Sequence, residues 1–390
     1  MNQKVLVAGL NFTVLRFCVL AGLVRFVARN EIRHIRWNTF DKLVLAWSVV
    51  GSIIYVIQWG SMSAVIYKCG VMFDCLGMYL VFRNTITCWG DIIIAIRYFA
   101  IFAIISAPLI MLEKFQQKSF YEIFGPVGAQ FHRGRFRCAG PFPHYIMMGL
   151  FWANLLPLFY ACVRAGIGKS LHYIAIAAAL VCIALSASST PIISMAAIIV
   201  LWNIYSLRRY GRQIFWGIIG SLVLLQIGMN TPVWHLIARV DLFSGSTGWH
   251  RYELINEAVD HFGEWAFLGC QSTAHWGEGL TDITNQFILE GVEGGFITLA
   301  VFVILLFFAI KTMGGYSLRK IPSCYQWLAW GVCISLLGHC ISFFGVSYFG
   351  QIKMLLYLTF AIVGLTYDLQ ASPARSVRMA APGSVAVNNF

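Results

Sequence analysis

Charged side chains are scarce in this sequence. They make up only 11% of its 390 residues, whereas soluble globular domains carry about 25%. Hydrophobic residues make up 59%, and the mean hydropathy is +0.74. This shortage of charge excludes an ordinary soluble domain and predicts an all-α polytopic membrane protein. The 30 Phe, 16 Tyr and 13 Trp are typical of lipid-facing helices with aromatic belts at both interfaces.

Several functional signals are also missing. No Gly-rich phosphate loop opens a helix after a strand, and no expected cytoplasmic loop is long enough for a soluble nucleotide-binding domain. The 11 cysteines lie mostly in apolar runs without metal-type spacing, and no His-x-x-x-His pair occurs, so we expect no metal and no cofactor. The net charge of +12 is dispersed over many loops, which favours membrane topology over nucleic-acid binding.

Apolar runs long enough to cross a bilayer, at about 20 residues each, predict eleven transmembrane helices. We expect residues 1–369 to form a single transmembrane domain and residues 370–390 to be a disordered cytoplasmic tail. The predicted spans are 5–28, 41–60, 64–82, 92–112, 143–163, 171–188, 191–207, 213–229, 286–310, 326–344 and 350–367.

Lysine and arginine in the short loops predict the orientation. One side receives fifteen of them and the other side three, so the first side should be the cytoplasm. Two long segments, 113–142 and 230–285, then lie outside. Residues 241–282 alone hold seven of the 16 acidic residues and three of the nine histidines. Polar groups of this kind on an apolar chain indicate where function should be sought.

The first external segment carries three alternating arginines, Arg133, Arg135 and Arg137. In an extended chain they point to one side, because side chains repeat every two residues. Three guanidinium groups at a membrane entry are suited to holding phosphate or pyrophosphate. The alternative is a basic belt that touches lipid headgroups.

The second external segment predicts an amphipathic helix over about 249–262, with an apolar face of Tyr252, Ile255, Val259 and Phe262. Arg251 lies in its first turn, where a cation costs about 0.3–1 kcal/mol against the helix dipole. A bound anion reverses that cost, so Arg251 is a candidate phosphate ligand. An internal salt bridge to Glu253 or Glu278 is the alternative.

Further polar groups precede the next span. His275 or Asp282 could remove a proton from an attacking hydroxyl near the membrane surface, although a lone histidine is more often a structural hydrogen-bonding group. Glu290 lies at the start of the span itself, where a charge is costly unless it is paired or faces a cavity. Gly291, Gly294 and Gly295 have helix-packing spacing.

These residues carry a family resemblance. The motifs Arg137-x-x-Gly140-x-Phe142-x-His144 and Gly248-Trp249-His250-Arg251 are followed by Phe267-Leu268-Gly269, and then by Thr284-Asn285-Gln286-Phe287-Ile288 with Glu290. Together they resemble the O-antigen ligase and polysaccharide polymerase superfamily of bacterial inner membranes. The segment Ser347-Tyr348-Phe349-Gly350-Gln351 is similar to its exopolysaccharide branch.

The resemblance implies a membrane-embedded, metal-independent glycosyltransferase with a GT-C-like fold and a large periplasmic loop. It would transfer glycan with inversion from an undecaprenyl-pyrophosphate carrier to a glycan or lipid acceptor at the periplasmic face, most simply as a polymerase. The family's essential arginines match Arg137 and Arg251. Where the family often has histidine before the motif asparagine, this chain has Thr284, so Asp282 or His275 must supply any base.

We expect further substrate contacts from Arg133, Arg135, His144, His250, Asn285 and Glu290. The bilayer, and other polysaccharide-assembly proteins, are the expected partners. Two other functions fit the sequence: a transporter or flippase of polyprenyl-linked glycan, and a non-catalytic membrane partner in a synthesis complex. A transporter predicts polar groups near the midplane and repeated halves, and no internal repeat is evident.

Overall fold

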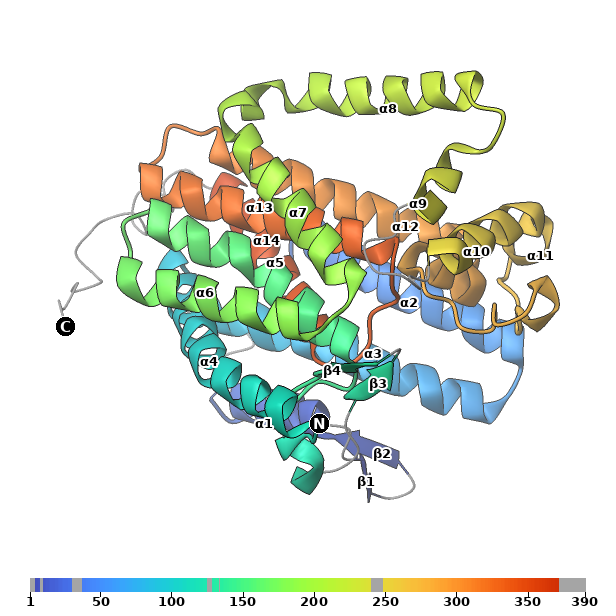
Figure 1. The fold of residues 1–390 in the computed structure, drawn as a ribbon, viewed down its shortest axis with the longest axis horizontal. Helices are drawn as coiled ribbons and strands as arrows, with labels where there is room; N and C mark the ends of the chain where they lie inside the picture. Colours follow the sequence, from blue (N-terminus) through green and yellow to red (C-terminus); the bar gives the residue numbers. More distant parts are fainter. Residues whose placement is uncertain are drawn as a thin grey trace.

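The computed structural model describes residues 4–7, 10–29, 37–124, 128–132, 134–239 and 248–371. It is a bundle of helices with two small antiparallel hairpins (Figure 1), which pair β1 (Lys4–Val7) with β2 (Leu10–Thr13) and β3 (Gln130–His132) with β4 (Arg135–Arg137). The helices in chain order are α1 (Val14–Arg29), α2 (Thr39–Trp59), α3 (Met62–Thr85), α4 (Trp89–Gln116), α5 (Tyr145–Arg164), α6 (Lys169–Leu185), α7 (Ser189–Asn203), α8 (Gly211–Gly228), α9 (Leu236–Arg239), α10 (Gly248–Asp260), α11 (Phe262–Trp265), α12 (Gln286–Ser317), α13 (Ser323–Phe343) and α14 (Ile352–Ala371).

Eight apolar helical stretches in the described residues are long enough to cross a membrane, which gives the chain the architecture of a polytopic integral membrane protein. α2 illustrates how they form. Asn38 and Asp41 build a capping box at its start, and the left-handed Gly60 (φ 55°) ends it. Its 21 residues span about 31 Å, close to the hydrocarbon thickness of a bilayer.

The prediction of eleven spans differs from this count in three places. The expected first span, 5–28, is not one helix, because β1 and β2 precede α1, whose 16 residues cover only about 24 Å. The 17 residues of α6 fall just below spanning length. α7 and α8 join through the 3₁₀ segment Ile204–Tyr210 into one apolar run of 40 residues.

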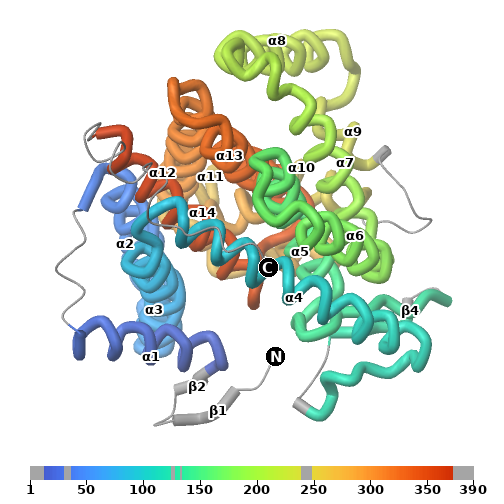
Figure 2. The backbone as a smooth tube through the Cα atoms, turned by 90° about the vertical axis from the view of Figure 1, so that its left-hand side faces the viewer, coloured from blue at the N-terminus to red at the C-terminus, as the bar shows by residue number. Residues whose placement is uncertain are grey.

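The buried centre of the bundle is formed by α5, α13 and α14, in which most residues are buried. α5 packs against α6, α7 and α13, while α12 packs against α2 and α13. α8 differs from all of them, because none of its residues is buried and most of its length lies away from the bundle in both views (Figures 1 and 2). Its Phe215 contacts Phe307 of α12, with the ring centres 6.0 Å apart. Its exposed side chains are apolar, which suits contact with lipid.

The loops sort to two ends of the bundle. At one end Arg83 forms an ion pair with Asp368, and the indole of Trp89 donates to the hydroxyl of Tyr316 at 3.2 Å. At the other end Gln351 donates to the carbonyl of Pro141 at 2.9 Å, and Gln271 donates to the carbonyl of Gln58 at 2.7 Å. This is the alternation of helix directions that the sequence predicts. Which end faces the cytoplasm stays a prediction.

A break in the helical conformation of α12 allows the second external segment to pack against this helix. Gly295 leaves the helical conformation with φ 67° and ψ 176°. A Cβ atom there would lie 2.3 Å from the carbonyl oxygen of Phe267, and the next residue, Phe296, donates to the carbonyl of Ala266 at 2.8 Å. The glycines predicted to pack helix against helix therefore include one that receives the backbone of the external segment.

The C-terminal end of the chain differs in part from the predicted disordered tail. α14 continues to Ala371, so the first residues of the expected disordered tail are helical. Residues 372–390 lie outside the described part of the chain.

Candidate functional site

The connection between α13 and α14, residues 344–351, brings the predicted site segments together at one end of the bundle. The carbonyl of Gly345 accepts from Nε of Arg251 at 3.1 Å. The backbone N–H of Tyr348 donates to the side chain of Gln286, at the start of α12, at 2.7 Å. Gln351 reaches the loop before α5, as described above. The α13–α14 connection thus joins three segments that are far apart in the sequence.

Arg251 is buried, with only 7% of its surface exposed. Besides Gly345, it donates from Nη2 to Oγ1 of Thr190 at 2.8 Å. Both partners are neutral, and no carboxylate of the described residues lies within ion-pair distance of Arg251. The alternative of a salt bridge to Glu253 or Glu278 is therefore wrong. Burial lowers the pKa of Arg251, yet a guanidinium remains charged.

A buried cation with neutral partners is costly, since its desolvation is not offset by an opposite charge. Arg251 also lies in the first turn of α10, where the helix dipole adds positive potential. Both features favour an anion beside Arg251. The role of Arg251 as an anion ligand stays a prediction.

The amphipathic helix itself is confirmed, as α10 covers Gly248–Asp260. Its buried face was predicted incorrectly, because it consists of Gly248, Arg251, Leu254 and Ala258. Of the predicted apolar face, Val259 is 51% exposed and Phe262, just beyond α10, is 45% exposed. This face turns Arg251 toward Gly345 and Thr190, which accept its hydrogen bonds.

The first external segment forms the β3–β4 hairpin. Phe136 is buried between Arg135 and Arg137, so these two arginines share one side of β4, as predicted. Nη1 of Arg137 donates to the hydroxyl of Tyr145 at 2.7 Å, and its guanidinium lies 4.9 Å from the centre of that ring. The Nε atom of Arg137 is buried and has no hydrogen-bond partner among the described residues. Arg133 lies outside the described residues.

His144 links this hairpin to both other segments. Its ring lies 4.1 Å from that of Tyr145 and 6.0 Å from that of Phe349 in the α13–α14 connection. Its Nδ1 accepts from the N–H of Ile146 and so caps α5, which requires the neutral imidazole. Burial lowers the pKa of His144; Asp282 raises it and Arg137 lowers it, so both charges lie near this ring.

Two adjoining cavities open beside the start of α12. One, of about 450 Å³, is lined by Asp282, Cys270–Thr273 and the aromatic rings of Tyr55 and Trp59. The other, of about 260 Å³, is lined by Glu290, Lys68 and Tyr348 among others. The two share Leu289, Glu293 and Ser347 as a common wall. Asp282 is exposed, so its carboxylate can reach a molecule in the first cavity.

The remaining predicted residues around α12 have mostly structural contacts. Asn285 is 3% exposed and caps α12, accepting from the N–H groups of Phe287 and Ile288. Glu290 accepts from the indole of Trp47 at 2.9 Å and from the amide of Gln286 at 2.8 Å. His250 is half-buried beside the turn at Gly279, where a Cβ atom would lie 3.9 Å from its ring. Their predicted contacts with substrate stay predictions.

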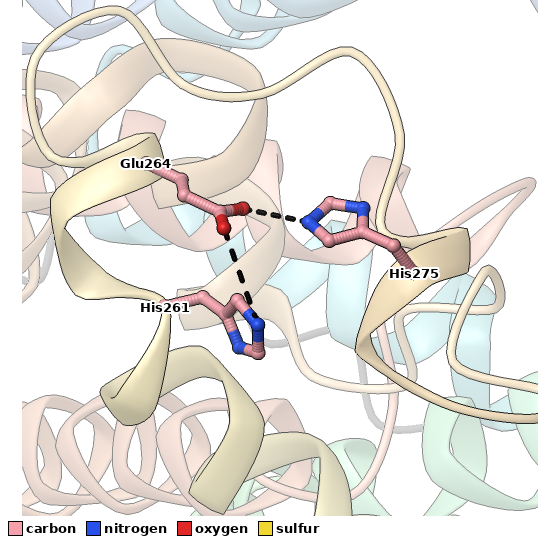
Figure 3. Close-up of side chains that lie close together, drawn as sticks. All are labelled: His261, Glu264 and His275. Carbon is pink, nitrogen blue, oxygen red and sulfur yellow. Dashed lines mark hydrogen bonds and ion pairs between the residues drawn. The ribbon is translucent and has the colours of Figure 1, made fainter.

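His275 belongs to a different cluster (Figure 3). Its Nε2 lies 2.7 Å from Glu264, which in turn lies 4.0 Å from Nε2 of His261. The bond from His275 lowers the pKa of Glu264. The alternative of a hydrogen-bonding histidine is therefore the one that the structure favours. Its role as a base stays a prediction.

The two cysteines of the external segments are poor nucleophiles. Both Cys138 and Cys270 are free thiols. Burial raises the pKa of Cys138 to about 12 and that of Cys270 to about 11. Both thiols are therefore protonated at neutral pH, and neither supplies a thiolate for covalent catalysis.

Three charged residues at this end of the bundle, Glu113, Lys68 and Glu293, belong to no motif of the sequence. Glu113, at the end of α4, accepts from the backbone N–H groups of Ala139 and Gly140 and so fixes the turn after β4. Lys68 forms an ion pair with Glu293 at 2.6 Å across the cavity wall. In the sequence, the one signal for these residues was a charged side chain within an apolar run. Such a charge is expected to form an ion pair or to line a substrate or ion pathway.

Comparison with known proteins adds no relative. No family model matches the sequence, and no curated protein is similar to it. The resemblance to the ligase and polymerase superfamily therefore rests on the residues quoted above, and the function that it implies is a proposal.

Proposed function

We propose that this chain is a bacterial inner-membrane glycosyltransferase of the O-antigen ligase and polymerase type. It transfers glycan from undecaprenyl pyrophosphate to a glycan acceptor at the periplasmic face, as a polymerase. The observation that carries the proposal is Arg251, a buried guanidinium with two neutral partners in the first turn of a helix. Such a group favours an anion beside it, because an opposite charge would offset its desolvation and the helix dipole.

The proposed anion is the pyrophosphate of the lipid carrier. The donor enters sideways from the bilayer, and Arg251 and Arg137 hold its two phosphates. Arg137 suits this role because its buried Nε has no acceptor in the described part of the chain, although Nη1 of the same guanidinium donates to Tyr145. As the bond between the anomeric carbon and the phosphate oxygen breaks, both guanidinium groups stabilise the charge that develops on the leaving group.

The proposed acceptor lies in the cavity beside Asp282. Its aromatic and polar lining, with Tyr55 and Trp59 beside Gln271, suits a sugar, which offers apolar ring faces and hydroxyl groups. The acceptor hydroxyl attacks the anomeric carbon opposite the pyrophosphate, which inverts the configuration. Asp282 accepts the hydroxyl proton. Asp282 is a better candidate for the base than His275, because the ring of His275 is paired with Glu264.

Glycan production in cells carrying Arg251→Ala tests the proposal, with protein level measured by blot. Loss of long glycan, with single carrier-linked repeats accumulating on the outer face, is the expected result. Repeats trapped on the inner face would indicate a transporter instead, and long glycan left on its carrier would indicate a ligase. Arg212→Ala, in the exposed start of α8, is the matched control and should leave the glycan unchanged.

A further inference from the structure

His261, Glu264 and His275 gather at the surface of the second external segment (Figure 3). One ligand atom from each lies within 4.8 Å of the other two. His261 and Glu264 are three residues apart at the start of α11, so they face the same side. His275 reaches them from the 3₁₀ turn Ala274–Trp276. We propose that these three side chains bind a divalent transition metal ion, with Zn²⁺ as the preferred ion.

The separations of the ligand atoms suit such an ion. Zinc bonds of about 2.0–2.1 Å in tetrahedral geometry place neighbouring ligand atoms about 3.3 Å apart. The two distances from Glu264 lie on either side of this value, at 2.7 Å to Nε2 of His275 and 4.0 Å to Nε2 of His261. All three side chains are partly exposed, so small rotations bring them to the required spacing.

The surroundings orient two of the ligands. Nδ1 of His261 lies 3.0 Å from the carbonyl oxygen of Glu257. A carbonyl only accepts, so Nδ1 carries the proton and Nε2 of the neutral ring keeps its lone pair for a metal. The indole of Trp276 stacks on His261 and donates to Glu264 at 3.3 Å. This indole restrains both ligands from the same side.

The types of ligand decide which ion fits. Two imidazoles and one carboxylate favour zinc and other first-row transition ions, whereas magnesium and calcium prefer oxygen alone. Three protein ligands leave the fourth zinc position to water. The side chain of Glu257 lies 3.5 Å from His261 and adds negative charge that attracts a cation.

The ion would tie α11 to the turn at His275 and so restrain the intervening residues. These include part of the lining of the cavity that also holds Asp282, namely Cys270–Thr273. The bond from Thr273 to the carbonyl of Leu280 at 2.7 Å carries the restraint further along the segment. The metal would therefore restrain this segment, at a place separate from Arg251 and from the chemistry proposed there.

Zinc titration of the purified full-length protein in detergent, without a polyhistidine tag, tests the proposal. A chromophoric zinc chelator reports free Zn²⁺. One equivalent should bind, and Glu264→Gln and His275→Ala should each weaken it by about 100-fold or more, beyond the 10- to 100-fold typical of outer-shell changes. Asp260→Asn is the control, because it removes a neighbouring exposed carboxylate that only Asn256 contacts among the described residues. It should leave the affinity within about 3-fold.

Two results would overturn the site. One is wild-type protein that binds no zinc, which decides the matter even if a variant fails to fold. The other is equal affinity in the wild type, Glu264→Gln and Asp260→Asn. A second readout is thermal unfolding in detergent. Zinc should raise the midpoint of the wild type and of Asp260→Asn, and leave that of Glu264→Gln unchanged.

Discussion

Thr190 accepts a hydrogen bond from Arg251 at 2.8 Å, and so ties the start of α7 to the first turn of α10. The two residues are 61 positions apart in the sequence. Their contact places a permanent positive charge at the end of the bundle where Arg137, His144 and Asp282 also lie.

The carbonyl oxygen of Gly345 accepts a hydrogen bond from Arg251. A Cβ atom at this position would lie 2.8 Å from Cγ2 of Thr190 and 3.7 Å from Cζ of Arg251. Gly345→Ala should therefore displace Arg251 and lower glycan production by about 10-fold, since misplacing a charged group by even 1 Å is costly. Glycan length on gels from cells with matched protein levels measures the effect.

Gly315→Ala in α12 is the matched control for this change. No heavy atom lies within 4 Å of its Cβ position, and alanine favours a helix over glycine by about 0.5–1 kcal/mol. The control should keep full production. Equal production in the two variants would show that the contact of Arg251 with Gly345 is not needed.

Asp282 is the proposed base. Asp282→Asn keeps the shape of the side chain but cannot accept the proton, so transfer should slow by about 100- to 10,000-fold. Transfer by purified protein from a carrier-linked donor to an acceptor glycan measures it. Asp260→Asn removes an exposed acid from α10 and serves as the control. A greater loss in His275→Gln than in Asp282→Asn would reverse the assignment of the base.

The fold and the site were predictable to different degrees. Shortage of charge revealed the membrane helices, because apolar runs of spanning length are a strong local signal. The first apolar run, 5–28, was wrongly predicted to be one transmembrane helix, because hydropathy does not distinguish a hairpin followed by a short helix from a single span. Arg251 was found from its place in a helix turn, which is also local information.

Long-range contacts could not be predicted in this way. The partners of Arg251 at 190 and 345 are distant in the sequence, and only the folded bundle brings them together. The buried face of α10 was missed because it combines Leu254 with Gly248, Ala258 and an arginine, so it is not the most apolar stripe of the helix. The sequence did not indicate that His261 and Glu264 lie together with His275, because His275 follows only after a turn.

His144 makes the stability of the protein depend on pH. Burial lowers its pKa from the usual 6.5. The unfolded chain then binds a proton more readily than the folded one, so stability is full above about pH 6.5 and falls as the pH drops towards the folded pKa. His144→Asn keeps a helix cap that does not titrate, and should remove this loss.

Thermal unfolding in detergent at about pH 8 and about pH 5.5 measures the effect. The wild type should lose more stability than His144→Asn between these two conditions. An equal loss in both proteins would mean that protonation of His144 is not coupled to folding.

At the opposite end of the bundle, Arg83 forms ion pairs with two carboxylates. It donates to Asp41 at 3.1 Å and forms an ion pair with Asp368, while Asp41 is only 1% exposed. Arg83→Met leaves Asp41 buried without its counter-charge and should cost about 3–5 kcal/mol of stability. Denaturation in mild detergent should show this loss. Arg319→Met, at an exposed position, should stay within about 0.5 kcal/mol of the wild type, and a similar loss in both variants would refute the role of the ion pair.

The most direct test of the central claim is binding of undecaprenyl pyrophosphate to purified protein, compared between the wild type, Arg251→Lys and Arg251→Ala. Hydrogen bonds to charged groups contribute about 1.5–3 kcal/mol, so Arg251→Ala should weaken binding by about 10- to 150-fold. Arg251→Lys should lose nearly as much, because a single ammonium cannot make the paired contacts of a guanidinium. Unchanged affinity in both variants would contradict the anion site at Arg251, and with it the proposed glycosyltransferase.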